Sequence, residues 1–241
     1  MEIREINGEQ VNPADRLQRR LIFALAQNQT NGILAVQKAY TRACMIKGRR
    51  FIMKVMAFNG SPRKKKWNTV TLLDNALQGA MSAGAETELV QLYDLSFSGC
   101  ISCFSCKKLS RKEDGVCAVQ DDLSAVLDRV KEADALIIGT PVYYGAESAA
   151  TRAFLERLCF PYMKYAKNMQ SLFPKRINTA MIYTMNVPEE MLERMGFDQI
   201  FGITKMMLGM HFGACELLLS TDTLQYSDYD KFEAEMFNKN V

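Results

Sequence analysis

The order of short apolar segments and amphipathic segments from Met53 onward constrains the fold most. Segments with the period of β-strands alternate with longer segments in which apolar residues recur at helical spacing. The expected strands are 54–58, 86–92, 135–139, 178–184 and 215–220. The expected helices are 69–83, one that begins at 121–122, 148–158, 200–210 and a last one at 228–238. This alternation predicts an α/β domain with an open, doubly wound, five-stranded parallel sheet and helices on both faces.

A turn rich in phosphate-binding groups follows the first strand. Residues 59–63 read Asn-Gly-Ser-Pro-Arg, and Asn68 and Thr69 begin the next helix. Backbone N–H groups at a helix start, hydroxyls and a guanidinium suit an anion. The turn lacks the Lys-Ser/Thr ending of a nucleoside triphosphate loop, and the chain contains no Gly-x-Gly-x-x-Gly, so a single phosphate fits best. The same residues also fit a plain strand-to-helix turn beside three solvated lysines at 64–66.

Four later stretches agree with this turn in order and spacing. They are Gly99-Cys100 to Cys117, Asp-Asp-Leu at 121–123, an apolar strand that ends in Thr-Pro-Val-Tyr-Tyr-Gly at 140–145, and Ala-Phe-Leu-Glu-Arg at 153–157. With the turn, they resemble the flavodoxin-like NAD(P)H-dependent FMN reductases from Met53 to about Pro174. The resemblance implies a flavodoxin-like sheet of order 2-1-3-4-5. The ligand of such a sheet lies at the carboxyl ends of strands one and three, where the strand order reverses.

The resemblance also implies FMN as the cofactor. The residues implied to hold its phosphate are Ser61, Arg63, Asn68 and Thr69, and those implied to contact its ring are Pro141, Val142, Tyr143, Tyr144, Gly145 and Asn186. Tyr183 and Thr184, at the end of the fourth strand, are further candidates by position. Because the flavin carries the chemistry, no catalytic side chain is expected. The single histidine, His211, is expected to pack against the core or to cap its helix.

The activity that the resemblance implies is an NAD(P)H-dependent oxidoreductase. The nicotinamide would reduce FMN, and the electrons would pass to a small-molecule acceptor such as a quinone or a free flavin, or to a metal ion or another protein. One alternative is an electron carrier of the flavodoxin type, which a partner protein reduces. A second is a phosphoprotein- or nucleotide-binding module that uses the same turn without redox activity.

Four cysteines lie close together in the sequence. Cys100, Cys103 and Cys106 are separated by two residues each, and ten residues precede Cys117. Three cysteines at this spacing can hold one corner of a cubane cluster, and the fourth ligand need not be near in sequence. The pattern resembles the iron-sulfur flavoproteins, although the last gap is longer than that branch leads us to expect. A 4Fe-4S cluster, a structural zinc ion and reduced free thiols all remain open. The other cysteines, Cys44, Cys159 and Cys215, are expected to pack.

Composition excludes several classes of protein. The chain is 48% hydrophobic and 24% charged, and its apolar runs are far shorter than the roughly 20 residues that a membrane helix needs. We expect no membrane span, no secretory signal and a cytoplasmic protein. Residues 1–52 hold nine Lys and Arg and four Asp and Glu, so 21 basic and 23 acidic residues of the totals of 30 and 27 lie beyond them. This balance gives no basic domain for nucleic acid.

Residues 1–52 form an N-terminal extension to the domain at 53–241. We favour the hypothesis that translation of the native protein starts at Met53, because Gly-Arg-Arg at 48–50 can be back-translated as a ribosome-binding site. The alternative is an extra helix from about Pro13 to Met45. A homodimer or homotetramer is expected through the 161–174 connection and the C-terminal helix.

Overall fold

The computed structural model describes residues 52–223, except 66, 111–113, 166 and 168–169, and the backbone of two short strands before them. These strands are β1 (Met45–Ile46) and β2 (Arg49–Arg50), which pair antiparallel. Cys44 and the helix expected at 228–238 lie outside the described residues. So does the helix expected at 13–45, apart from Met45 itself, which lies in β1.

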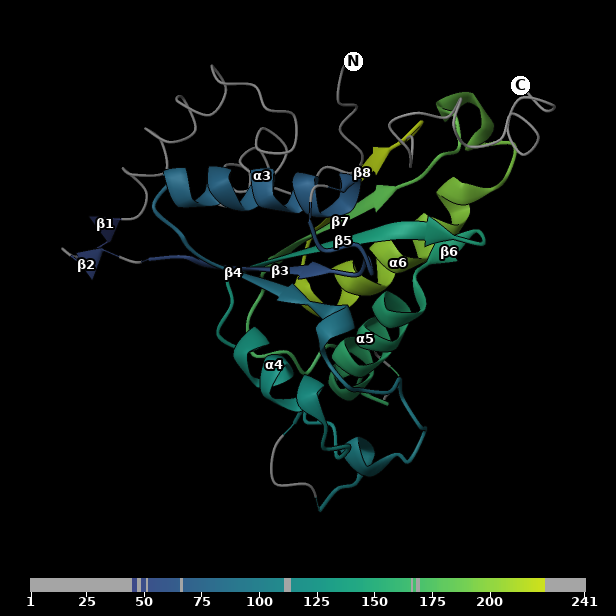
Figure 1. Cartoon of the computed structure of the whole chain (residues 1–241). Helices are drawn as coiled ribbons and strands as arrows, with labels where there is room; N and C mark the ends of the chain where they lie inside the picture. The colour runs from purple at the N-terminus through teal and green to yellow at the C-terminus, as the bar shows by residue number, and fades with distance from the viewer. Residues whose placement is uncertain are drawn as a thin grey trace.

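Five parallel strands form the sheet (Figure 1). They are β3 (Lys54–Asn59), β4 (Glu86–Gln91), β5 (Ala135–Tyr143), β7 (Asn178–Thr184) and β8 (Cys215–Ser220). They lie in the order β4-β3-β5-β7-β8, with every pairing parallel. This is the predicted order 2-1-3-4-5, so the flavodoxin-like fold class is confirmed.

One strand runs further than the sequence predicts. β5 continues four residues past Gly139 to Tyr143 and then pairs with a short antiparallel strand, β6 (Ala146–Glu147). Pro141 falls inside this extension, although Thr-Pro is typical of a loop. The proline is tolerated because pairing with β3 ends at Gly139, so no strand on that side needs its missing N–H.

Helices cover both faces of the sheet. α3 (Asn68–Ser82) lies on one face, and α4 (Asp122–Val130), α5 (Ala149–Cys159) and α6 (Phe197–Phe212) lie on the other (Figure 1). Short 3₁₀ helices are η1 (Leu92–Asp94), η2 (Ser105–Lys107), η3 (Phe160–Tyr162) and η4 (Glu189–Met191). No helix in the described part of the chain is long and apolar enough to cross a membrane.

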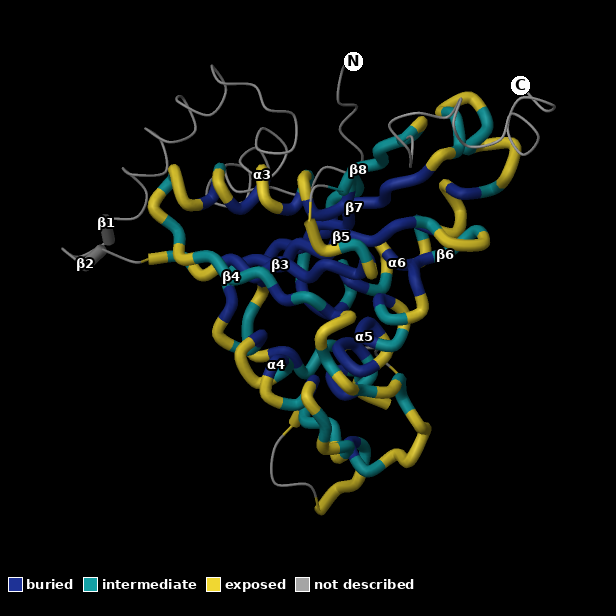
Figure 2. Tube along the Cα trace, in the orientation of Figure 1, coloured by how far each residue is buried: buried dark blue, intermediate teal, exposed yellow. Residues whose placement is uncertain are grey.

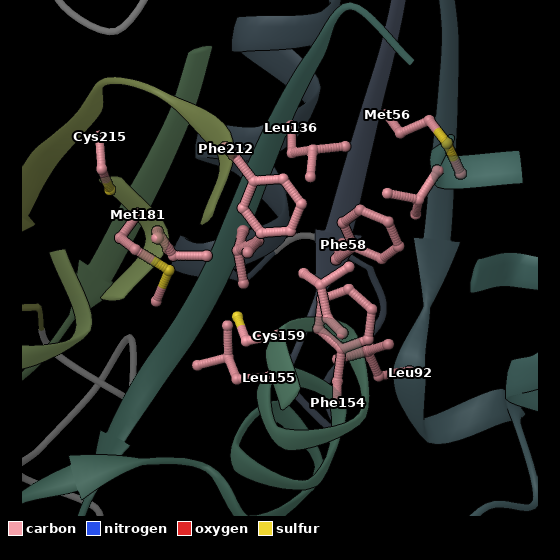
Figure 3. Packing of buried hydrophobic residues seen from close by; sticks show 14 of the residues in the cluster. Met56, Phe58, Leu92, Leu136, Phe154, Leu155, Cys159, Met181, Phe212 and Cys215 are labelled. Atoms are coloured by element: carbon pink, nitrogen blue, oxygen red, sulfur yellow. The ribbon is translucent and has the colours of Figure 1, made fainter. Parts of the chain in front are cut away.

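The apolar core is divided by the sheet into two layers. Alternate residues of β3 point to opposite faces, so Val55 packs with α3, whereas Phe58 packs toward α5. The rings of Phe58 and Phe154 are stacked with their centroids 4.4 Å apart (Figure 3). The central strands β3, β5 and β7 are buried along most of their length, whereas the edge strands β4 and β8 are only partly buried (Figure 2). Burial on both faces explains the uninterrupted apolar run in β5.

The longest excursion from this core is the segment 96–120, called the cysteine segment below. It connects η1 to α4 and reaches away from the sheet at the bottom of Figure 1. It ends at a capping box, in which Asp121 Oδ1 accepts a hydrogen bond from Leu123 N and Ser124 Oγ accepts one from Asp121 N. This box fixes the start of α4 where the acidic pair predicted it.

Candidate functional site

The turn after β3, residues 59–63, is held by its own hydrogen bonds and is called the cradle below. Ser61 N donates to Asn59 Oδ1 at 3.1 Å, and Arg63 N donates to Ser61 Oγ at 3.2 Å. Gly60 N donates to Gly139 O at 2.8 Å, which attaches the turn to β5. Asn59 and Ser61 are buried. The cradle is therefore a fixed structure and not a mobile connection.

Gly60 is required by its surroundings. A Cβ at this position would lie 1.8 Å from Thr151 Oγ1 and 3.1 Å from Gly139 O. Ser148 Oγ, at the N-cap of α5, donates to Gly60 O at 2.6 Å. The backbone of the cradle can approach α5 this closely only because Gly60 has no side chain.

The start of α3 adds positive character to the cradle. Its first turn contains no acidic residue, and Trp67 makes no side-chain cap, so no carboxylate offsets the N-terminal end of the helix dipole. The Arg63 guanidinium lies over the Trp67 ring, 4.1 Å from the centroid. Stacking on Trp67 holds the guanidinium beside the cradle.

A cavity of about 50 Å³ opens between the cradle and the carboxyl ends of β5 and β7. Its lining residues are Ser61, Arg63, Trp67, Asn68, Thr69, Pro141, Val142, Tyr143, Thr184, Met185, Asn186 and Thr223. Nine of these twelve were singled out from the sequence. Three were not: Trp67, Met185 and Thr223. Trp67 could have been found, because it directly precedes the predicted helix start, whereas Thr223 follows β8 in a stretch without any motif.

Tyr144 and Gly145 do not line this cavity. They form the tip of the β5–β6 hairpin, with φ of 51° and 85°, between the paired residues Tyr143 and Ala146. Two successive residues with positive φ are the requirement of a tight two-residue hairpin turn. The Tyr144 side chain is fully exposed.

The end of β7 provides the third wall, with one correction to the expectation. Thr184 is in place, and its Oγ1 lies 2.7 Å from Thr69 Oγ1 at the start of α3. The expectation that Tyr183 faces the cavity is wrong, because neighbouring strand residues point to opposite faces. Tyr183 is buried on the α6 side and donates its hydroxyl to Glu147 Oε1 at 2.6 Å. Burial, with the charge of Glu147, raises the pKa of Tyr183.

The four clustered cysteines meet at a second cavity. Cys100, Cys103, Cys106 and Cys117 all line it, together with Arg157 of α5. All four are free thiols. Among the described residues, no group of three or more His, Cys, Asp or Glu is arranged as a set of metal ligands. The fold thus brings the predicted thiols to one place without a preformed coordination shell.

The backbone between these cysteines has unusual dihedral angles. Ser102 and Phe104 have φ of 56° and 54°, in the left-handed region that costs about 1–2 kcal/mol for a residue with a side chain. Ser102 N also donates to Cys100 Sγ at 3.4 Å. Hydrogen bonds from Ser105 lower the pKa of Cys103, whereas burial raises that of Cys106. The turns direct the cysteines toward one side.

Lys107 joins the cysteine segment to the helical side of the fold. Its ammonium donates to the carbonyls of Phe160 and Pro161 and, at 2.6 Å, to that of Met163. Cys100 N donates to Glu156 Oε2 of α5 at 3.1 Å. The segment is thereby fixed to α5 and to the connection that follows it.

His211, Cys159 and Cys215 pack as expected. All three are buried in the α6 side of the core, and neither ring nitrogen of His211 has a hydrogen-bond partner among the described residues. Burial lowers the pKa of His211 and raises that of Cys159 to about 12. These side chains therefore pack in the core.

Comparison with known proteins finds relatives among the iron-sulfur flavoproteins. An iron-sulfur flavoprotein of Methanocaldococcus jannaschii is 40% identical over 105 residues, which are 44% of this chain and 51% of that protein. The chain therefore spans about half the length of the curated relatives it matches.

Two solved structures share the fold. An NAD(P)H:quinone oxidoreductase from Methanothermobacter marburgensis is 17% identical with a TM-score of 0.61, covering 77% of this chain and 95% of that one. An FMN-dependent NADH-azoreductase from Bacillus anthracis, solved with FMN, is 14% identical with a TM-score of 0.55, covering 73% and 91%. The family model described as NADPH-dependent FMN reductase matches residues 53–180. Because this match spans more than half of the chain, the protein belongs to the NADPH-dependent FMN reductase family.

Proposed function

We propose that the protein binds FMN between the cradle and the ends of β5 and β7 and acts as an NAD(P)H-dependent oxidoreductase on a small-molecule acceptor. The observation that carries the proposal is the cavity in which the phosphate-binding and ring-contacting residues meet. They come from three strand ends that are far apart in the sequence, which a plain turn after β3 would not require. The family match supports FMN as the occupant.

The phosphate would be held by the cradle and the start of α3. Ser61 and Thr69 offer hydroxyls, Asn68 offers an amide, and the first N–H groups of α3 are not offset by an acidic residue. Arg63 supplies a full positive charge, and Trp67 limits its movement. These groups suit one doubly charged phosphate.

The ring would lie against Pro141 to Tyr143 and Thr184 to Asn186. Bound FMN would accept a hydride equivalent from a nicotinamide and pass the electrons on. The protein's part is to orient the ring and exclude water from one side of it. Burial raises the pKa of the Tyr143 phenol, which favours its neutral, hydrogen-bond-donating form. No side chain in the cavity needs to act as a general base.

The phosphate assignment can be tested with two ligands that differ only in that group. We expect Arg63→Ala to weaken FMN binding about 10- to 100-fold, because a hydrogen bond to a charged group contributes about 1.5–3 kcal/mol. Riboflavin, which has no phosphate, should bind equally well to both proteins. Lys65→Ala, which removes a nearby exposed charge, is the matched control. Equal losses for FMN and riboflavin, or none for FMN, would contradict the assignment.

We propose a 4Fe-4S cluster as a second redox group, in the cavity of the four cysteines. The supporting observations are the four thiols that line one cavity and the two left-handed residues between them. The names of the relatives point the same way. Four thiolates also satisfy zinc. Iron, sulfide and zinc assays on Cys106→Ser, with Cys215→Ser as the control, distinguish the two metals and test the ligands.

A further inference from the structure

One charged side chain is fully buried beside the cysteine cavity. Arg157, in α5, is the only Lys or Arg in the buried class among the described residues, and its side chain is 0% exposed. Its terminal nitrogens are all engaged. Nη1 donates to Ser98 O and Asp121 Oδ2, and Nη2 donates to Val119 O and Asp121 Oδ1, at 2.8–3.1 Å. The guanidinium is held in one orientation by partners at both ends of the cysteine segment.

One donor of this guanidinium is left over. Nε is buried and has no hydrogen-bond partner among the described residues. A buried N–H without a partner is unfavourable, and a buried charge more so. No oxygen atom of the described residues accepts a hydrogen bond from Nε, so another kind of acceptor would stabilise it.

The nearest chemistry of that kind is the sulfur of the cysteine cavity. Arg157 lines the cavity together with all four thiols. Burial opposes the charge of Arg157, whereas the carboxylate of Asp121 and the sulfur of Cys117 raise its pKa. Cys117 is also only two residues from Val119, whose carbonyl oxygen accepts a hydrogen bond from Nη2.

Two charged side chains of the described residues line the cavity, Arg157 and Glu156, and Glu156 Oε2 accepts a hydrogen bond from Cys100 N. Asp121 offsets the charge of Arg157, and Arg157 holds the pKa of that carboxyl below its usual range even though burial opposes this. Four thiolates around a divalent ion carry a net charge of minus two, and a cation beside them stabilises that charge when the surroundings exclude water. Arg157 is the described cation that lines this cavity.

We propose that Arg157 is the positioning residue of the cysteine site: fixed by Asp121, Ser98 and Val119, it directs its remaining N–H at the sulfur of Cys117 and stabilises the four-thiolate form of the site. The inference rests on the proposed function of these cysteines as metal or cluster ligands. On this proposal the ion pair between Arg157 and Asp121 belongs to the metal site. Asp121 follows the cysteine segment directly and caps α4, so it links the site to that helix.

The test uses cobalt(II) as the probe, added to the reduced, metal-free full-length chain. Cobalt–thiolate absorbance reports the number of bound thiolates and the affinity without any measurement of activity. We expect wild-type protein to bind one cobalt ion through four thiolates. Arg157→Met should bind at least tenfold more weakly, and Arg157→Lys, which keeps the charge but not the fixed N–H, should fall between them. Arg152→Met, on the same helix and exposed, is the matched control and should bind as wild type does.

The possible outcomes separate the two proposals. If wild type binds no cobalt through its cysteines and takes up no iron-sulfur cluster when incubated anaerobically with iron and sulfide, the metal-site proposal fails, and this inference with it. If wild type binds and Arg157→Met binds equally well, only the inference is overturned. Arg157→Met leaves the Asp121 carboxylate without its ion-pair partner, which could itself disturb folding. The double variant Arg157→Met with Asp121→Asn removes that charge, and circular dichroism and FMN uptake show whether it folds. Wild-type cobalt affinity in that folded double variant would likewise overturn the inference. If the double variant does not fold, the Arg157→Lys protein provides the test. Wild-type cobalt affinity in Arg157→Lys would show that the directed N–H is not required and would overturn the inference.

Discussion

At the scale of single residues, the cradle depends on a glycine that could not carry even a methyl group. Gly60 lies against Thr151 and Gly139. We expect Gly60→Ala to lower the free energy of unfolding by about 1–3 kcal/mol, the usual cost of overpacking, and to weaken FMN binding more than riboflavin binding. Urea unfolding and ligand titration measure the two effects.

The matched control for Gly60 is a glycine with open space around it. Nothing lies within 4 Å of a Cβ built at Gly202 in α6, so Gly202→Ala should be neutral or stabilising by up to about 1 kcal/mol. Thr151→Ala, combined with Gly60→Ala, should recover part of the loss because it removes the nearest atom. A Gly60→Ala protein that unfolds and binds like wild type would show that the cradle is not packed as described.

His211 gives the protein a pH dependence that belongs to one residue. Burial lowers its pKa in the folded state, and the charge of Lys107 adds to this. As pH falls below about 6.5, the imidazole binds a proton in the unfolded chain but not in the folded one, so acid favours unfolding. The free energy of unfolding should therefore fall between pH 7 and pH 5, by up to about 1.4 kcal/mol per pH unit once the pH is below the unfolded pKa.

The comparison for His211 is simple because the chain has one histidine. In His211→Met, which stays apolar and buried, the slope of unfolding free energy between pH 6.5 and 5.5 should be clearly smaller than in wild type. Urea titrations at several pH values give both slopes. Equal slopes would mean that the folded protein binds this proton as readily as the unfolded chain does, so that burial does not lower the pKa of His211.

Residues in continuous motifs were predictable from the sequence, and residues placed by the fold were not. Ser61, Arg63, Asn68 and Thr69 follow one strand directly, so local chemistry identifies them. Tyr183 was misplaced because position at a strand end does not tell which face a side chain takes. From the sequence, Arg157 is visible only as part of the Ala-Phe-Leu-Glu-Arg motif, because its burial and its partners at 98, 119 and 121 depend on tertiary structure.

At the scale of elements, Lys107 attaches the cysteine segment to the connection that follows α5. Lys107 bonds three carbonyls of the connection after α5, and its ammonium lies 4.6 Å from the Phe160 ring centroid. We expect Lys107→Met to loosen the segment, because the carbonyls lose their shared donor. Faster amide exchange across 96–110 and faster reaction of Cys106 with a thiol reagent are the measurements.

The control for this loosening is Lys164→Met, an exposed lysine in the same connection. It should leave amide exchange and thiol reactivity as in wild type. FMN affinity should be unchanged in both variants, because neither lysine lines the cradle cavity. If Lys107→Met leaves exchange in the segment unchanged, the carbonyl contacts do not hold it.

Elements with strong periodicity were predicted to within a few residues at their ends. The predicted bounds of the strands 178–184 and 215–220 are confirmed. The predicted strand at 135–139 is shorter than β5 because Thr-Pro is typical of a loop. The extension of β5 is paired with β7, which the sequence alone does not reveal. β6 is two residues long, too short for any period. The contacts of the cysteine segment could not be predicted, since its charged residues carry no pattern.

At the scale of the whole molecule, α5 joins the two proposed sites. Ser148 at its N-cap bonds the cradle, and Arg157, nine residues later and about 14 Å along the helix axis, lines the cysteine cavity. The order of the strands places the cradle at the carboxyl ends of β3 and β5. The length of α5 between Ser148 and Arg157 sets the distance from the cradle to the cysteine cavity. The expected oligomer through 161–174 and the cytoplasmic location stay predictions.

The central claim is that the protein is a flavin-dependent oxidoreductase, and an anaerobic absorbance spectrum tests it most directly. The full-length chain is saturated with FMN, freed of excess ligand, and titrated with NADPH or NADH under the spectrometer. We predict flavin bands that stay with the protein and bleach in proportion to the nicotinamide added. A broad visible absorbance with iron and sulfide would add the cluster. A protein that retains no FMN, or whose bound FMN is not reduced by either nicotinamide, would contradict the claim.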